Sequence, residues 1–157
     1  MLNFVYDHDE EISQFITMLT PGAGVAGFGR RKTIGVIDEE GRLIAGLIYF
    51  NYDPNAASIE YGGASIDPRW LSRTTIRRMF EYPFVECGCQ ILITRVRAEN
   101  ERLLSQLARL NFNLTYMPRM YGRSEDGVIC TLTDDQWLDS ALSKRIYRDV
   151  RGRQEAA

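Results

Sequence analysis

Apolar residues recur along this chain with two periods, one typical of helices and the other typical of strands. Residues 9–19 begin with three acidic residues and carry an apolar stripe at helical spacing, which predicts an amphipathic helix. The stripe consists of Ile12, Phe15, Ile16 and Leu19. The helical period also predicts helices over residues 67–84, 100–112 and 134–150. Alternating or continuously apolar segments predict strands over residues 2–7, 32–37, 43–53, 57–67, 89–99, 112–122 and 127–133.

Glycine and asparagine mark the places where this chain turns. Gly41 lies between two expected strands, where it can take the left-handed conformation of a short hairpin loop. Gly62 and Gly63 interrupt a strand, which indicates a bulge or the close approach of another backbone or a ligand. Asn111 follows a helix and suits the left-handed position that ends it. Residues 20–32, TPGAGVAGFGRRK, predict a loop that either borders a substrate or simply connects two elements.

The order of these elements predicts the fold class. Three consecutive strands are followed by helix, strand, helix and two further strands, which is typical of α+β proteins with a mixed central sheet. With 157 residues, 45% of them hydrophobic, the chain is long enough to bury one core. We therefore expect a single domain over residues 1–150, followed by a disordered tail over residues 151–157.

Composition and charge exclude several classes of protein. The net charge of −2 gives no general attraction to nucleic acid or to an anionic membrane. The apolar run LIAGLIYF is too short for a membrane helix, and the first residues have neither the basic nor the apolar region of a signal peptide. Cys87, Cys89, Cys130 and the single histidine, His8, do not have the spacing of a zinc site. We expect a cytoplasmic protein without a metal, whose thiols are buried and reduced.

Residues 67–84 combine the expected helix with an unusual charge. Four arginines crowd its first turns, although a helix N-terminus carries a partial positive charge. They are Arg69, Arg73, Arg77 and Arg78. The cluster either binds an anion or forms a solvated face whose arginines pair with acidic residues elsewhere, and the sequence leaves both alternatives open.

The segment AENERLLSQLARLNF, together with the order of elements, resembles the GNAT superfamily of acetyl-CoA-dependent N-acetyltransferases. In the family's N-x-x-(A/S)-x-x-x-x-x-x-L-G-F helix, Asn100 opens the motif, Leu110 and Phe112 close it, and Asn111 replaces the usual glycine. Leu107 stands where many members have an acid-catalyst tyrosine, which the branch that acetylates ribosomal proteins also lacks. The phrases PRWLSR, FEYPF, CGC and TLTDDQW are similar to a subgroup found in phage and prophage-rich bacterial genomes.

The resemblance covers residues 2–132 and implies both the architecture and the co-substrate. The implied fold is a mixed central sheet with helices on both faces, splayed between the fourth and fifth strands. Acetyl-CoA would lie in the V formed by the strands that carry Glu60 and Ile91, with the two adjacent glycines as a bulge near the thioester. Its pantetheine arm would pair with backbone groups of Ala64, Ser65 and Ile66.

The family's pyrophosphate loop, (Q/R)-x-x-G-x-(G/A), falls on a segment of this chain that lacks every signature residue. That segment is Leu71, Ser72, Arg73, Thr74, Thr75 and Ile76. Consecutive amides at a helix N-terminus can still bind phosphate, and hydroxyl and guanidinium groups can replace part of what the glycines allow. Asn100 would serve both as a helix cap and as a cofactor contact.

The resemblance also suggests an acid and a base. Glu60, six residues before Ile66, would take the proton from the attacking amine, and partial burial would raise its pKa toward the range of a general base. The alternative is an exposed strand carboxylate. Tyr121 is the first candidate for the acid that protonates the thiolate, with Tyr61 and Tyr116 as rivals; most tyrosines simply pack.

Three functions follow from these features. The first is transfer of acetyl from acetyl-CoA to a primary amine of a small molecule or protein, by direct attack in a ternary complex. The second is a degenerate member of the fold that serves as a binding or interaction module. The third is a nucleic-acid-modifying protein that uses the basic segment SKRIYRDVRGR; the negative net charge and the lack of a nucleic-acid motif argue against it. We expect a monomer or a homodimer.

Overall fold

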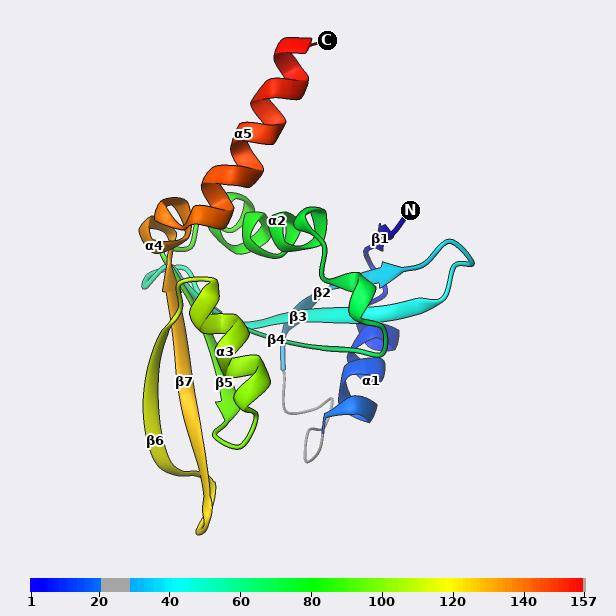
Figure 1. The fold of residues 1–157 in the computed structure, drawn as a ribbon. Helices are drawn as coiled ribbons and strands as arrows, with labels where there is room; N and C mark the ends of the chain where they lie inside the picture. Colours follow the sequence, from blue (N-terminus) through cyan, green and yellow to red (C-terminus); the bar gives the residue numbers. More distant parts are fainter. Residues whose placement is uncertain (21–28, 157) are drawn as a thin grey trace. The chain divides into compact units, whose positions relative to one another are not determined.

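The computed structural model describes residues 1–20 and 29–156. These residues form two compact units, Met1–Met79 and Phe80–Ala157, whose elements are labelled in Figure 1. Most of the glycine-rich loop expected at residues 20–32 lies outside the described residues.

The first unit contains four antiparallel strands in the order β1-β2-β3-β4. They are β1 (Asn3–Val5), β2 (Arg31–Ile37), β3 (Leu43–Asp53) and β4 (Ser58–Ser65). Every residue of β3 from Ile44 to Tyr49 is buried, as the continuous apolar run predicts for a strand covered on both faces. Gly41 has φ +78° in the β2–β3 turn, which confirms its predicted conformation.

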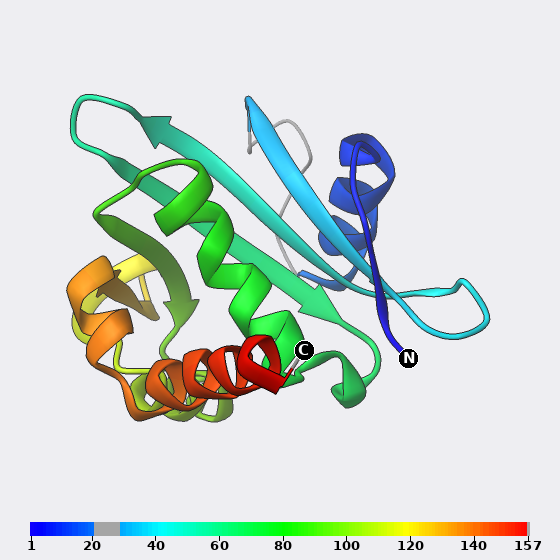
Figure 2. The same ribbon diagram turned by 90° about the horizontal axis from the view of Figure 1, so that it is seen from above.

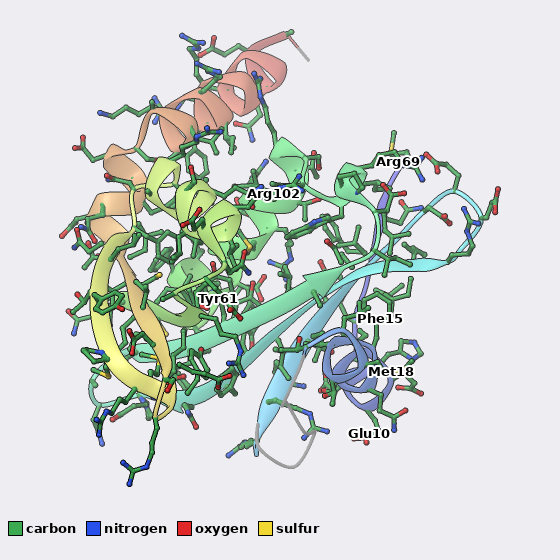
Figure 3. All side chains as sticks on the ribbon, turned by 60° about the horizontal axis from the view of Figure 1, so that its bottom comes forward. Glu10, Phe15, Met18, Tyr61, Arg69 and Arg102 are labelled. Atoms are coloured by element: carbon green, nitrogen blue, oxygen red, sulfur yellow. The ribbon has the colours of Figure 1, made fainter. Side chains whose placement is uncertain are left out.

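Helix α1 (Asp9–Leu19) packs on this sheet by its apolar stripe. Ile12 and Ile16 form a buried cluster with Ile48 of β3, and Figure 2 shows the helix beside β1 and β2. Figure 3 shows Phe15 and Met18 on this helix; Phe15 packs against the cluster, whereas Met18 is 85% exposed. The predicted helix is therefore confirmed over its full length; Ile12, Phe15 and Ile16 of its predicted face pack on the sheet, whereas Leu19 is 42% exposed.

In the pairing of β4 with β3, the bulge expected at the adjacent glycines does not occur. Gly62 and Gly63 continue the regular pairing with β3, and the irregularity lies between Phe50 and Asp53 instead. The alternative explanation of close backbone approach holds at Gly63, where an added Cβ would lie 2.9 Å from the carbonyl oxygen of Gly46. The backbone of the neighbouring strand β3 is thus what approaches Gly63 closely and leaves no room for a side chain there.

The helix expected over residues 67–84 is divided into three pieces. A 3₁₀ turn, η2 (Pro68–Trp70), precedes α2 (Arg73–Glu81), and a π-helical turn, η3 (Tyr82–Glu86), follows it. The division arises because Leu71 has ψ 74°, outside the helical range, and because Ser72 caps a new helix. Pro83, which cannot donate to a preceding carbonyl, lies in the π turn.

The second unit contains three antiparallel strands in the order β5-β7-β6. They are β5 (Ile91–Arg97), β6 (Asn113–Gly122) and β7 (Glu125–Thr133), and Figure 1 shows β6 and β7 as a long hairpin. The core of this unit includes Phe80. The centroid of its ring lies 4.3 Å from the centroid of the Trp137 ring and 6.1 Å from that of the Phe112 ring.

Helix α3 (Glu101–Arg109) begins and ends as predicted. The Asn100 side chain accepts a hydrogen bond from the Leu103 amide and so caps the first turn. Asn111 has φ +76°, the left-handed conformation expected there, and its Nδ2 donates to the Gln136 carbonyl at 2.8 Å. The residues at the two ends of this helix were therefore sufficient to predict where it begins and where it ends.

The terminal helix expected over residues 134–150 is two helices, α4 (Asp134–Asp139) and α5 (Ala141–Ala156). They separate at Ser140, which is extended at ψ 145° and whose Oγ accepts from the Ser143 amide as the cap of α5. Residues 151–156, expected to be a disordered tail, continue α5 to Ala156. The expected tail is wrong because the second cap starts a new helix that extends through it.

The cysteines are thiols, with Cys89 and Cys130 fully buried and Cys87 half-buried. Burial raises the pKa of both Cys89 and Cys130 to about 11. Across residues 1–20 and 29–156, no group of three or more His, Cys, Asp or Glu side chains is placed to hold a metal ion. No helix in this described part is long and apolar enough to cross a membrane.

Candidate active site

The N-terminus of α2 is the segment predicted to bind a pyrophosphate. Ser72 caps it: its Oγ accepts from the Thr75 amide at 3.1 Å, and its carbonyl accepts from the Ile76 amide at 2.9 Å. Thr75 is 1% exposed and Ile76 is 8% exposed, so their side chains face the interior. Thr74 and Arg73 are exposed in the first helical turn, where amides carry the positive end of the helix dipole. Direct phosphate contact from this segment is therefore limited to that turn and to exposed Leu71.

The hydroxyl groups of the segment differ in what they can offer. Ser72 Oγ lies 2.9 Å from Thr75 Oγ1, so these two hydroxyls hydrogen-bond with each other in addition to the cap. The exposed Thr74 hydroxyl is thus better placed for a phosphate than the hydroxyl of Ser72. The amides of this turn suit a pyrophosphate. To contact that pyrophosphate, the Ser72 hydroxyl would have to release the Thr75 amide that it caps.

Arg69 and Arg78 of the arginine cluster contact other groups of the protein. Arg69 forms ion pairs with Asp67 at 2.7 Å and with Glu39 at 3.9 Å, and Figure 3 shows its position. Its hydrogen bond lowers the pKa of Asp67, and the same bond raises the pKa of Arg69. The guanidinium of Arg78 lies 5.2 Å above the Tyr6 ring and donates to its hydroxyl at 2.8 Å. For Arg69, the structure shows the pairing with acidic residues that the alternative interpretation expected, whereas Arg78 contacts a tyrosine.

The end of β4 carries the backbone expected to pair with pantetheine. The Ile66 amide donates to the Ile44 carbonyl at 2.9 Å, so this group is directed at β3. Because backbone groups alternate along an antiparallel strand, those of Ser65 point to the opposite edge of β4. Of the three predicted residues, Ser65 has the orientation that an added extended chain would need, while Ala64 and Ile66 pair with Gly46 and Ile44.

Glu60, the predicted base, is half-buried on β4 opposite Phe50. The Asn51 side-chain amide donates to its Oε1 at 3.3 Å. Asn51 itself has φ +50°, which fits the irregular end of the β3–β4 pairing. The carboxylate is thus oriented by a neighbour without being sealed from solvent, as a group that exchanges protons with an acceptor amine must be.

Tyr121 differs from its rivals in its surroundings. It is half-buried, burial raises its pKa, and the Arg97 guanidinium lies 4.5 Å above its ring and partly opposes that rise. Tyr116 is exposed and its hydroxyl donates to the Asp126 carboxylate, a bond that raises the pKa of Tyr116 and lowers that of Asp126. Tyr61 is 8% exposed and stacks on Tyr49.

A phenol that is to act as an acid must be protonated at neutral pH and accessible to its substrate. Tyr121 meets both conditions, since it is half-buried and its pKa is raised. Arg97, which contacts it from β5, was not a predicted site residue. No local pattern could identify it, because β5 and the Tyr121 end of β6 are separated in the chain by α3.

The predicted residues divide between the two units. Glu60, the end of β4 and the α2 segment belong to the first unit, whereas Asn100 and Tyr121 belong to the second. Within the first unit, one short connection joins the β4 backbone to the first turn of α2. Asp67, Glu39 and Tyr6 also engage the arginines and were missed; only the Asp67–Arg69 spacing gives a local signal.

No protein-family model matches the chain, and no curated protein sequence matches it. Solved structures do match. A mutant form of the spermidine/spermine N-acetyltransferase SpeG from Vibrio cholerae superposes with a TM-score of 0.72 at 15% identity, over 88% of this chain and 98% of that one. The same enzyme in complex with manganese ions gives a TM-score of 0.69 at 16% identity, over 88% of this chain and 95% of that one. Its dodecameric structure in an intermediate state gives 0.70 at 15% identity, over 88% and 96%.

These superpositions extend over nearly the whole of both chains, while the sequences differ at most positions. With sequence identities of 15–16%, these superpositions show a shared fold and not a shared activity. The predicted fold class is confirmed: the chain has the α+β GNAT fold of these N-acetyltransferases.

Proposed function

We propose that this protein is an N-acetyltransferase that transfers acetyl from acetyl-CoA to a primary amine by direct attack in a ternary complex. One observation carries the proposal: a TM-score of 0.72 over 88% of this chain and 98% of a spermidine/spermine N-acetyltransferase. The neighbours are named for spermidine and spermine, so a polyamine is the first acceptor class to test.

Acetyl-CoA would supply an activated acetyl group as a thioester. We assign its pyrophosphate to the first turn of α2, with the Thr74 amide and the Arg73 guanidinium as donors, and its pantetheine arm to the outward backbone groups of Ser65. Asn100, which already caps α3, is assigned as a further contact. These groups suit a phosphorylated, amide-bearing chain, because they combine helix N-terminal amides, a guanidinium and an extended strand edge.

The assigned proton transfers use one carboxylate and one phenol. Glu60 would accept a proton from the amine, since its carboxylate is partly accessible and held by Asn51. Tyr121 would return a proton to the leaving sulfur, since its raised pKa keeps the phenol protonated at neutral pH.

Isothermal titration calorimetry with acetyl-CoA tests the first step. Arg73→Ala removes a guanidinium from the first turn of α2, and Arg69→Ala is the matched control, because it removes the same charge from a side chain paired with Asp67. We expect Arg73→Ala to weaken binding by about tenfold or more, the effect of one charge-assisted hydrogen bond, and Arg69→Ala to change it little. A wild-type protein with neither binding heat nor a thermal shift would refute the proposal.

Transfer is then measured as thiol release with spermidine as acceptor. Glu60→Gln preserves shape and removes the base, so kcat should fall by about 10²-fold or more. Tyr121→Phe should lower kcat with little effect on acetyl-CoA affinity, whereas Tyr116→Phe is the control for loss of a phenol elsewhere on β6. Unchanged transfer by either site variant would dismiss that residue from its role.

A second candidate function is supported by the α2 segment itself. The loop lacks glycine, the Ser72 hydroxyl is engaged as a cap, and Arg69 is paired with acidic residues. These features are those of a fold that has lost acetyl-CoA and serves as a binding module. The same calorimetry separates the two, because this second function requires that acetyl-CoA not bind.

A further inference from the structure

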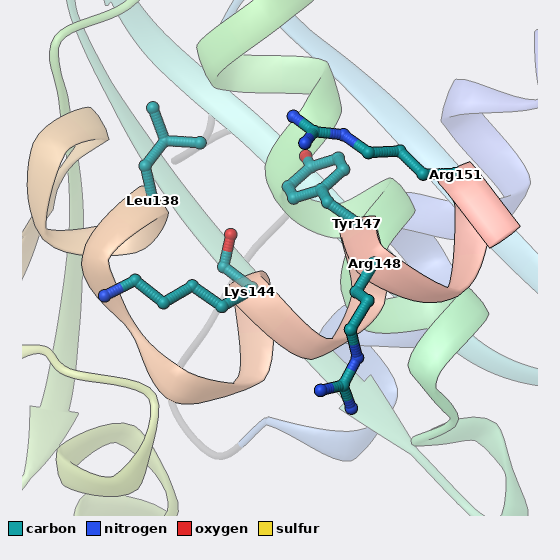
Figure 4. Close-up of a pocket in the computed structure, with 6 residues that line it drawn as sticks. Leu138, Lys144, Tyr147, Arg148 and Arg151 are labelled. Atoms are coloured by element: carbon teal, nitrogen blue, oxygen red, sulfur yellow. The ribbon is translucent and has the colours of Figure 1, made fainter.

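A cavity of about 620 Å³ lies beside the helices α4 and α5, within the second unit. Figure 4 shows Leu138 of α4 together with Lys144, Tyr147, Arg148 and Arg151 of α5 around it; Ser143 completes the lining. Residues 143, 147 and 151 are each one helical turn apart and so share a face of α5. The volume is within the range of sites that hold small organic molecules, about 300–1,000 Å³.

The lining of this α5 pocket includes a buried polar group that lacks a partner. Ser143 is 0% exposed, and its Oγ makes no hydrogen bond within the described part of the chain. Its backbone amide is satisfied by Ser140 Oγ, so only the hydroxyl is left over. A buried hydroxyl without a partner is unfavourable, and a ligand atom in the pocket that accepts its proton would remove that penalty.

The charges around the pocket are unbalanced. Lys144 is paired with Asp139 at 2.9 Å. Arg148 and Arg151 are exposed, and neither forms an ion pair with any side chain that the structure describes. Two guanidinium groups without an acidic partner in the described part of the chain therefore line the cavity, and guanidinium groups bind phosphate oxygens through two parallel hydrogen bonds.

Two further residues of the lining are apolar or aromatic. Leu138 is 57% exposed although it is a large aliphatic residue, and the half-buried ring of Tyr147 lies on the same face of α5 as the Ser143 hydroxyl. Figure 4 shows the Arg151 side chain beside the Tyr147 ring, with the Arg148 side chain extending away in the opposite direction. A flat aromatic body would cover Leu138 and stack on Tyr147, while its anionic group reached the arginines.

We infer that the α5 pocket binds a phosphate monoester with a flat aromatic body, of the nucleoside monophosphate class. A phosphate monoester carries a charge between about −1.5 and −2 at neutral pH, which balances Arg148 and Arg151. The aromatic body packs on Leu138 and Tyr147, and a ring nitrogen or carbonyl accepts the Ser143 hydroxyl proton. The pocket shares no residue with the α2 segment assigned to acetyl-CoA and does not depend on the proposed transferase activity.

The test is calorimetry of the full-length protein with AMP, adenosine and inorganic phosphate as separate probes. AMP should bind more tightly than either fragment, because only AMP has both a phosphate and an aromatic body. Arg148→Ala and Arg151→Ala should each weaken AMP binding by about tenfold or more, and Ser143→Ala should weaken it by a smaller factor. Arg145→Ala is the control, since it removes an exposed arginine of α5 that does not line the pocket.

Three outcomes would overturn the inference. The first is that AMP does not bind, or binds wild type and the two pocket arginine variants equally. AMP binding that saturating acetyl-CoA abolishes, and that Arg73→Ala weakens, would place the nucleotide in the acetyl-CoA site instead. Steeply salt-dependent retention of a single-stranded adenine oligonucleotide, without affinity for AMP, would identify α5 as a nucleic-acid surface. Circular dichroism of each variant excludes unfolding as the cause of lost binding.

Discussion

The adjacent glycines of β4 allow a sharp test of how the sheet of the first unit is packed. Replacing Gly63 with alanine places a Cβ 2.9 Å from the carbonyl oxygen of Gly46 and 3.0 Å from Leu47 Cδ2. The first contact is with backbone of the neighbouring strand, which cannot rotate away. At Gly62 the same substitution meets only Ile48 Cγ2 at 3.6 Å, an ordinary van der Waals contact. The two variants therefore differ in packing while they share the same chemical change on the same strand.

We expect Gly63→Ala to lower the free energy of unfolding by about 1–3 kcal/mol, the usual effect of overpacking. Gly62→Ala should leave it unchanged or raise it by about 0.4–1 kcal/mol, because alanine restricts the unfolded chain. For a chain of this size, a change of about 1 kcal/mol corresponds to a Tm change of about 2–4 °C. Urea unfolding followed by circular dichroism gives the difference directly, with equal m-values as the check that both variants unfold in the same way.

Equal stability of the two variants would refute the close approach that the structure shows at Gly63. A Gly62→Ala variant of normal stability can then be titrated with acetyl-CoA. Weakened binding would indicate that Gly62 is needed for a ligand to approach β4, the role that the glycine pair was first expected to have.

Three other substitutions test the remaining elements. Asn111→Ala should lower the free energy of unfolding by about 1–2 kcal/mol, because alanine is strained in the left-handed conformation and loses the hydrogen bond to Gln136. Asn111→Gly loses only the hydrogen bond, so an alanine variant as stable as the glycine variant in urea would contradict this prediction. Ser143→Ala should raise Tm by about 2–4 °C by removing a buried hydroxyl without a partner, and a lowered Tm would show that the hydroxyl is satisfied. Hydrogen bonds from the Arg42 amide and side chain lower the pKa of Asp38 in the folded protein. The stability that Asp38 contributes is therefore complete above the ordinary aspartate pKa of about 3.9, and it is lost as the pH falls through the lower pKa of the folded state. Asp38→Asn should therefore be destabilising at pH 7 and progressively less so below about pH 4, and a pH-independent difference in thermal melts would contradict the assignment.

The elements that carry the candidate residues were predicted more accurately than the contacts of their side chains. The sequence placed the segment proposed to bind phosphate at the start of a helix and Glu60 on the preceding strand, because the order of elements is read directly along the chain. It did not show that Ser72 caps α2 or that the polar Thr75 faces inward, since the helix begins later than the predicted start at residue 67. It also did not show that Arg78 stacks on Tyr6, which lies 72 residues earlier.

The sequence by itself determined the features that depend on a few neighbouring residues. The apolar stripe of α1, the cap at Asn100 and the left-handed residues Gly41 and Asn111 all follow from local hydrogen bonding and side-chain periodicity. Tertiary structure decided what depends on segments meeting after the chain returns. The close contact at Gly63, the Arg97 guanidinium above Tyr121 and the α5 pocket require two elements to be brought together, and no local pattern specifies which side chains then face each other.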